Sequence, residues 1–373
     1  MTIEPWSMVV AALCALTLMP LVIRVRTLGH GTTPSPQHVH EQPTSRLGGG
    51  IIFVAYALGV ALAIKFGRIP SGPLLALLAC AIPVFAAGIR EDVTHSLSPR
   101  HRLIAAVLSA LVASAFAGGV IARLDLPYLD DWLHFLPLAL LLTCFMVAGA
   151  CNAMNLIDGA HGLAAGTALL MFAGMAAAAG QVGDQFVFVQ AVTMIGALAG
   201  FLAWNYPRGR VFMGDGGAYF IGFIYAELSI LIVARNEGIS AWFVIMLAAY
   251  PIVETLYSIY RRKIRHRTPS TEPDAWHLHS LVYRQMGLKA AGEAADRSND
   301  RANARVAPRL WLHGLICCAT ALILRDNTPA LIAGVIVYAM FYVVQYRMLW
   351  KYQQAHTQEL SFDIQEPRSV GTD

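Results

Sequence analysis

The chain of 373 residues is 57% hydrophobic and only 13% charged, and its mean hydropathy is +0.55. A soluble globular domain carries about 25% charged residues, so this composition excludes an ordinary soluble domain. The formal net charge is +4. We attribute it to membrane topology and to contacts with anionic membrane lipids, and we expect no nucleic acid partner.

Long apolar segments recur along the chain. An apolar stretch of about 20 residues spans a bilayer as a helix, and such stretches are centred near residues 15, 55, 81, 112, 143, 171, 195, 225, 249, 317 and 337. The sequence therefore predicts an all-α, polytopic integral membrane protein with about eleven transmembrane helices. The first stretch, Met8 to Ile23, lacks a preceding basic region, which favours a retained helix over a cleaved signal peptide.

The distribution of basic residues predicts the orientation, because cytoplasmic loops are enriched in Lys and Arg. An outside N-terminus places most of the 27 basic residues inside. The exceptions are Lys65, Arg68, Arg123, Arg235 and Arg325. We expect the C-terminus in the cytoplasm.

We expect one integral membrane domain over residues 1–353, with a long cytoplasmic loop at about 261–309. Within this loop, the stretch from His277 to Met286 predicts a short amphipathic helix at the membrane surface. The polar tail, 354–373, is expected to be disordered.

Polar residues gather where the predicted helices end on the cytoplasmic side. An apolar segment that ends at Ala150 continues directly into Asn152, Asn155 and Asp158. Polar groups at the end of a membrane helix are costly and are usually kept for function. Their spacing of three residues places them roughly on one face, if the helix continues that far.

Two further acidic clusters have comparable positions. The adjacent carboxylates of Glu91 and Asp92 repel each other at a helix end, so a cation or a proton is expected nearby; a structural pair with Arg is the alternative. Glycines flank Asp215 and leave it open to a phosphate-bound Mg²⁺, which prefers one or two carboxylates. The alternative for Asp215 is a helix-capping role.

Basic and histidine residues complete the set. Arg46 precedes the glycines at 48–50, a combination that favours an anionic ligand, although close helix packing also explains the glycines. His277 and His279, shortly after Asp274, are interpreted as donors to a phosphate, with exposed loop histidines as the alternative. The clusters together predict a cytoplasmic site for Mg²⁺ and a phosphorylated substrate, and the membrane setting implies a lipid as the second substrate.

These stretches resemble the polyprenyl-phosphate N-acetylhexosamine-1-phosphate transferases, the WecA/MraY group of glycosyltransferase family 4. The most specific pieces are Asn-Ala-Met-Asn-Leu-Ile-Asp-Gly at 152–159 and Phe-Met-Gly-Asp-Gly-Gly at 212–217. The segment His277-Leu-His279 resembles the histidine motif of this group, and Pro251-Ile-Val-Glu254-Thr255 resembles its ninth helix. The resemblance extends from about residue 40 to residue 285.

The resemblance implies transfer of a sugar-1-phosphate from a UDP-N-acetylhexosamine to undecaprenyl phosphate, with release of UMP. It implies Mg²⁺, with Mn²⁺ as an alternative, bound by Asp215 and Asp92. It implies catalytic roles for Glu91, Asp92 and Asp158. The implied substrate-binding residues are Arg46, Asn152, Asn155, Asp274, His277 and His279. The implied location is the bacterial inner membrane with the site facing the cytoplasm, and a homodimer stays open.

The sequence departs from the family pattern at two positions. Glu91 stands where the family often has aspartate, and Ser280 stands where a further histidine is frequent. The second departure favours an enzyme that initiates O-antigen, enterobacterial-antigen-like or capsule synthesis over the peptidoglycan branch. UDP-GlcNAc is the expected donor, with UDP-linked FucNAc or QuiNAc as alternatives.

A transporter and a catalytically inactive membrane scaffold are the alternative functional classes. A transporter would carry charges near the bilayer midplane and often an internal repeat. The sequence shows no internal repeat, and Glu227 and Glu254 are the acidic residues within predicted spans. A catalytically inactive scaffold is disfavoured because the acidic clusters are present.

Overall fold

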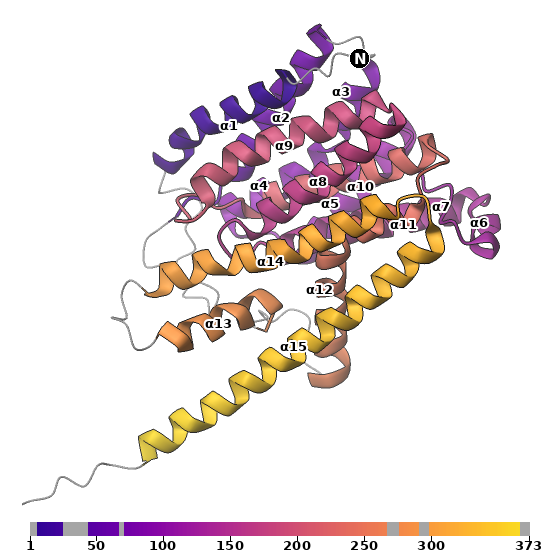
Figure 1. Cartoon of the computed structure of the whole chain (residues 1–373). Coiled ribbons are helices and arrows are strands. Elements are labelled where there is room, and N and C mark those ends of the chain that lie inside the picture. Colours follow the sequence, from indigo (N-terminus) through magenta and orange to yellow (C-terminus); the bar gives the residue numbers. More distant parts are fainter. Residues whose placement is uncertain (1–5, 25–43, 67–70, 267–275, 291–297, 366–373) are drawn as a thin grey trace, which may run out of the picture.

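The computed structural model describes residues 6–24, 44–66, 71–266, 276–290 and 298–365 (Figure 1). These residues form helices and connecting loops, with no β-strand among them. The elements are α1 (Trp6–Arg24), α2 (Gly48–Phe66), α3 (Ser71–Cys80), α4 (Ile82–Thr94), α5 (Pro99–Phe116), α6 (Pro127–Leu133), α7 (Leu136–Leu156), α8 (Leu163–Val182), α9 (Gln185–Asn205), α10 (Gly214–Arg235), α11 (Ala241–Leu247), α12 (Ala249–Tyr260), a π-helical turn (Arg261–His266), α13 (Leu278–Ala290), α14 (Ser298–Ile323) and α15 (Thr328–Gln365).

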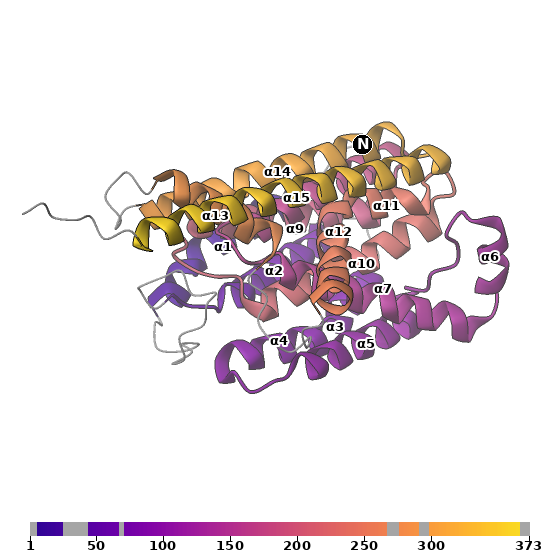
Figure 2. The ribbon, with the colours of Figure 1, turned by 90° about the horizontal axis from the view of Figure 1, so that it is seen from below.

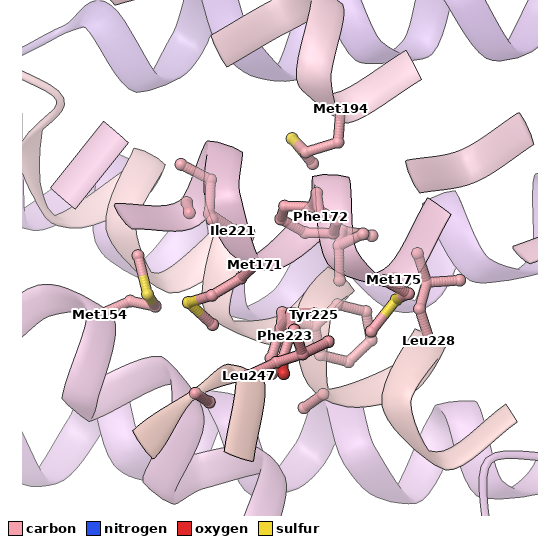
Figure 3. Packing of buried hydrophobic residues seen from close by; sticks show 14 of the residues in the cluster. Met154, Met171, Phe172, Met175, Met194, Ile221, Phe223, Tyr225, Leu228 and Leu247 are labelled. Atoms are coloured by element: carbon pink, nitrogen blue, oxygen red, sulfur yellow. The ribbon is translucent and has the colours of Figure 1, made fainter. Parts of the chain in front are cut away.

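Helix α10 is the centre of the bundle. Its sequence is apolar on every side, a pattern typical of a helix enclosed by others, and nearly all of its residues are buried. It packs against α2, α4, α5, α7, α8 and α9. In Figure 3, Phe223 and Tyr225 of α10 lie among Met171 and Met175 of α8 and Leu247 of α11. This packing fixes the position of the first turn of α10, where Asp215 lies.

The described residues contain nine helical segments that are long and apolar enough to cross a membrane, with α3 and α4 counted together. The number is ten if α11 and α12, which are bent by 75° at their junction, form one span. Figure 2 shows α5, the remaining predicted span, alongside α4. The polytopic, all-α class is confirmed; the count of eleven and the sides of the two termini are not.

Two helices continue beyond the apolar spans predicted for them. Helix α14 already begins at Ser298, within the predicted loop, because its Ala-rich start favours helix and buries Val306 and Leu310. Helix α15 continues to Gln365, past the predicted start of a disordered tail, since no Gly or Pro lies between Gly334 and Pro367. Residues 366–373 lie outside the described part.

The predicted helix after His277 is confirmed as α13. Its residues Leu278, Leu281, Val282 and Met286 are buried, and the helix packs against α14 and α15. Figure 1 shows α13 beneath α14 and beside α15. The histidines at its start are therefore held by the fold.

The end of the bundle opposite Asp215 is held by Asp184. One carboxylate oxygen caps α9 by accepting the N–H of Val187 at 3.2 Å. The other accepts from Arg235 Nε at 2.8 Å and Asn236 Nδ2 at 3.0 Å at the end of α10. Burial opposes ionisation of this carboxyl, but the hydrogen bonds and the charge of Arg235 outweigh burial, and the pKa of Asp184 lies below its usual value.

We expect Asp184→Asn to lower the melting temperature at pH 7, with a cost of roughly 1 kcal/mol because Arg235 is half-exposed. A carboxyl group with a lowered folded-state pKa stabilises the fold fully above its unfolded pKa, about 4. This contribution is lost as the pH falls through the folded value. Thermal unfolding in detergent between pH 3 and 7 should show a larger acid-induced drop for the parent than for the variant; equal drops would contradict this role.

Candidate active site

The segments that precede α2 and α10 pair through their backbones. The N–H of Phe212 donates to the carbonyl of Ser45 at 2.8 Å, and the N–H of Gly48 donates to the carbonyl of Phe212 at 3.0 Å. The N–H of Gly49 donates to the carbonyl of Met213 at 2.8 Å. This pairing carries Arg46 to the first turn of α10.

Glycines let α2 and α4 touch α10 through their backbones. A Cβ atom on Gly49 would lie 2.2 Å from the backbone nitrogen of Gly217, and one on Gly88 would lie 2.5 Å from Cα of Gly216. No side chain fits at these contacts. The packing interpretation therefore holds for Gly48 and Gly49, and the close contact brings the carboxylates of α4 and α10 together.

Asp92, at the end of α4, caps the start of α10. Its Oδ1 accepts the N–H of Asp215 and its Oδ2 accepts the N–H of Gly216, both at 2.8 Å. The side chain of Asp92 is fully buried. Helix N-termini leave N–H groups without intrahelical partners and favour negative charge, so this carboxylate stabilises the α4–α10 contact. Its predicted catalytic and metal-binding roles stay predictions.

The carboxylate of Asp215 is the meeting point of three other elements. Its Oδ1 accepts from Asn155 Nδ2 at 2.9 Å and from Arg46 Nη2 at 3.3 Å, and its Oδ2 pairs with Nη1 of Arg102. The alternative reading of Asp215 as a helix cap is wrong, because Asp215 lies inside α10 and the capping carboxylate comes from Asp92. Arg102 is not among the residues predicted for the site, although it follows the acidic pair at the start of an apolar helix.

The remaining acidic and amide residues lie around this centre. Helix α7 ends at Leu156, so Asp158 lies in the following turn and not on the helical face of Asn152 and Asn155. Burial raises the pKa of Asp158 to about 7, against the opposing charge of Arg46. Asn152 lies one helical turn before Asn155, half-buried.

Glu91 lies on α4 directly before Asp92, but its carboxylate bonds to the α4–α5 connection and not to the cluster around Asp215. Its Oε2 accepts the N–H of Leu97 at 2.7 Å. This bond closes the connection between α4 and α5, which sets the position of Arg102. The contact indicates a structural use of Glu91, while its predicted catalytic role stays a prediction.

The histidine segment is held by Glu254 of α12. Glu254 Oε1 lies 3.1 Å from His277 Nδ1 and accepts the N–H of Leu278 at 3.2 Å. Its Oε2 accepts from the hydroxyl of Tyr342 at 2.7 Å. One buried carboxylate thus joins α12, α13 and α15 and orients His277. The sequence marks Glu254 as an acidic residue within a span and as part of the segment that resembles the family's ninth helix, but it gives no sign of this contact with His277.

His279 reaches the turn that carries Asp158. A Cβ atom on Gly159 would lie 2.1 Å from His279 Nε2, so the imidazole lies directly against this glycine. The rings of His277 and His279 are stacked with centroids 5.4 Å apart. The structure therefore brings the histidine segment against the Asn152–Asp158 stretch, and their joint role in one site stays a prediction. Asp274 lies outside the described residues.

The residues around Asp215 fit a bound Mg²⁺. Among the described side chains, no three His, Cys, Asp or Glu form a metal-binding group. Mg²⁺ needs only one or two carboxylates, since water and phosphate oxygens complete its coordination. Two guanidinium groups and a carboxamide converge on Asp215 and stabilise its negative charge, so a cation that binds this carboxylate takes the place of a guanidinium group. Both oxygens of Asp92 accept backbone N–H groups, which are fixed by α10, whereas the partners of Asp215 are side chains that can turn away, so Asp215 is the better candidate.

The fold and the site together define a class: a multi-pass membrane protein with carboxylates and guanidinium groups gathered at one end of its helical bundle. Residues 74–233 match the model of glycosyl transferase family 4. This range contains Asp92, Asn155, Asp158 and Asp215, whereas Arg46 and the two histidines lie outside it. A relative that is 31% identical, over 67% of this chain and 72% of its own length, completes the evidence that the chain belongs to glycosyl transferase family 4.

Similar proteins are named as transferases of related chemistry. A probable undecaprenyl-phosphate N-acetylglucosaminyl 1-phosphate transferase of Bacillus subtilis (strain 168) is 28% identical over 275 residues, 73% of this chain and 75% of that protein. A phospho-N-acetylmuramoyl-pentapeptide-transferase of Synechococcus sp. (strain JA-3-3Ab) is 31% identical over 261 residues, 67% and 72% of the two chains. A decaprenyl-phosphate N-acetylglucosaminephosphotransferase of Mycolicibacterium smegmatis (strain ATCC 700084 / mc(2)155) is 28% identical over 320 residues, 73% and 77%.

Proposed function

We propose that this protein transfers N-acetylglucosamine-1-phosphate from its UDP-linked form to undecaprenyl phosphate and releases UMP, as the first step of a cell-surface polysaccharide. The observation that carries the proposal is the Asp215 carboxylate, held among Arg46, Arg102 and Asn155 at the start of α10. The names of two relatives support N-acetylglucosamine. Another UDP-N-acetylhexosamine, such as the FucNAc or QuiNAc form, is the alternative donor.

The arrangement suits phosphoryl transfer, in which positioning and charge neutralisation provide most of the catalysis. A phosphate oxygen of the lipid attacks the phosphorus atom bonded to the sugar, and the bond to UMP breaks. Mg²⁺, or Mn²⁺, held by Asp215 would neutralise charge on the diphosphate. Arg46 and Arg102 place further positive charge beside it.

The carboxyl groups next to Asp215 can handle protons at the acceptor phosphate. Asp158, whose pKa is raised to about 7, can gain or lose a proton near neutral pH, as a general acid or base must. The buried carboxylate of Asp92 orients the start of α10, and we expect it to orient or deprotonate the lipid phosphate. His277 and His279 would contact the sugar nucleotide from the other side of the Asp158 turn.

The location and assembly follow from the same proposal. The substrates place the enzyme in the bacterial inner membrane with the site facing the cytoplasm, where UDP-sugars are made. A site on one face of the membrane requires its residues at one end of the bundle. Asp92, Asp158 and Asp215 gather at one end, whereas Asp184 lies at the other. A homodimer is compatible with this arrangement.

Purified protein, undecaprenyl phosphate, Mg²⁺ and a panel of UDP-sugars provide the direct test. We expect UMP release and a lipid product whose mass names the sugar, with UDP-GlcNAc the best donor, and we expect chelation of the metal to stop the reaction. Absence of UMP release with every UDP-N-acetylhexosamine would reject the proposal. Substrate flux across proteoliposomes without UMP release would favour the transporter.

Glu254 offers a test of the histidine segment. In Glu254→Gln the neutral amide keeps an acceptor for His277 but loses the charge, so we expect KM for the UDP-sugar to rise about tenfold with a smaller change in kcat. Glu254→Ala removes every contact to Leu278 and Tyr342 and should also lower the melting temperature. Steady-state kinetics and thermal unfolding of both variants check this. An unchanged KM in Glu254→Gln would show that the charge of Glu254 has no part in donor binding.

A further inference from the structure

Arg102 lies in the core of the site with its hydrogen-bonding capacity only partly used. Its side chain is 13% exposed, and Nη1 pairs with Asp215 Oδ2. The guanidinium lies over the ring of Tyr219, 5.8 Å from the ring centroid. Its Nε is buried and has no hydrogen-bond acceptor among the described residues. A buried donor without an acceptor is costly, so the surroundings of Arg102 are incomplete as they stand.

The missing acceptor can be assigned by chemistry. A guanidinium presents its N–H groups as a planar fork that matches phosphate oxygens, often through paired hydrogen bonds. The Asp215 carboxylate occupies one arm of the Arg102 fork, and the Nε arm is left over. A phosphate oxygen next to Asp215 would satisfy this arm.

Arg46 and Arg102 differ in how they depend on Asp215. The Nε of Arg46 also lies 3.7 Å from Oδ1 of Asp92, so Arg46 keeps a carboxylate partner when Asp215 is engaged elsewhere. Asp215 is the one carboxylate paired with Arg102 in the part of the chain that the structure describes. A cation that bound Oδ2 of Asp215 would leave Arg102 without a carboxylate partner, whereas Arg46 would still have Asp92.

We propose that Arg102 is a built-in counter-ion that holds the Oδ2 oxygen of Asp215 in the metal-free protein, competes with the divalent cation for it, and turns to a phosphate of the UDP-sugar once the cation has bound. The inference rests on the proposed function for the identity of the phosphate. Opposite charges stay paired in the exchange, since a divalent cation takes the place of the singly charged guanidinium at the carboxylate and the released guanidinium meets the negatively charged diphosphate.

The test measures metal binding without substrate. Purified protein in detergent is titrated with MnCl₂, and free Mn²⁺ is followed by electron paramagnetic resonance. We expect Arg102→Gln to bind Mn²⁺ about tenfold more tightly than the parent, because a positive charge beside the carboxylate is removed. With saturating Mn²⁺, the same variant should bind UDP-GlcNAc about tenfold more weakly in calorimetry.

A matched control and a second variant keep the outcomes distinct. Arg100→Gln removes the same charge from an exposed residue of the same helix and should leave both affinities unchanged. Arg102→Ala should repeat the tighter Mn²⁺ binding of Arg102→Gln. If Arg102 only positions Asp215, both Arg102 variants bind Mn²⁺ more weakly than the parent, and that result overturns the inference. Unchanged affinities in the variants, or a parent that binds no Mn²⁺, would also overturn it.

UMP release tests the proposed function, and Mn²⁺ affinity tests the role of Arg102. If the Arg102 variants bind Mn²⁺ more tightly than the parent but the parent releases no UMP from any UDP-sugar, the proposed function is rejected. The competition between Arg102 and the cation at Asp215 then still stands. A parent that releases UMP while Arg102→Gln shows the affinities of the parent would reject the inference alone.

Discussion

Asp215→Asn is expected to reduce transfer by at least about a thousandfold while the protein still folds and inserts. The asparagine keeps the size of the side chain and one acceptor oxygen but loses the charge that attracts Arg46 and Arg102. A divalent cation contributes several kcal/mol at a transferring phosphate, and each factor of ten in rate corresponds to about 1.4 kcal/mol. Loss of the cation therefore lowers the transfer rate by about a thousandfold.

Single-turnover transfer and thermal unfolding of the same preparation check this prediction. The matched control is Asp131→Asn, the same chemical change at an exposed residue of α6. We expect the control to keep full activity and the Asp215 variant to keep a melting temperature within a few degrees of the parent. Turnover close to that of the parent in Asp215→Asn would remove Asp215 from the metal site.

Much of the fold could be predicted because its physical causes are local. A long apolar segment must satisfy its backbone hydrogen bonds within itself in a bilayer, so each segment becomes a helix wherever its neighbours lie. Alternate crossing then places the ends of successive helices on alternate sides. This reasoning brought Asp92, Asp158 and Asp215 to one end of the bundle, where the structure also places them.

The contacts within the site could not be predicted because they depend on packing between distant segments. Asp92 and Asp215 are 123 residues apart, and the bond between them exists because Gly88 and Gly216 let two helices touch. The use of Asp92 as a cap for another helix has no local signal in the sequence. Arg102 and Glu254 were missed for the same reason, since an isolated charged residue near an apolar segment also fits a role in topology.

The ends of the helices were less predictable than their existence. Helix α7 stops at Leu156, so Asp158 leaves the helical face on which spacing alone had placed it. The turn that follows positions Gly159 against His279, and only tertiary packing determines that contact. Spacing rules hold inside a helix, and functional groups often lie where a helix has ended.

Asp92→Asn is expected to reduce transfer by about a hundredfold or more and, unlike Asp215→Asn, to lower the free energy of unfolding by about 2 kcal/mol. Both carboxylate oxygens of Asp92 accept N–H groups of α10. An asparagine has one acceptor oxygen, so its amino group must face the N–H of Asp215 or that of Gly216. A charge-assisted bond is lost, and two donors are brought together in a fully buried place.

Comparison with Asp92→Ala separates the two roles of this residue. The alanine leaves both N–H groups without an acceptor, so the melting temperature should fall in the order parent, asparagine variant, alanine variant. If Asp92 only accepted a proton from the lipid phosphate, both variants would lose transfer activity but keep the melting temperature of the parent. Because the cap sets the direction of the first turn of α10, a loss of stability should also weaken Mn²⁺ binding at Asp215, whereas a pure base leaves that affinity unchanged.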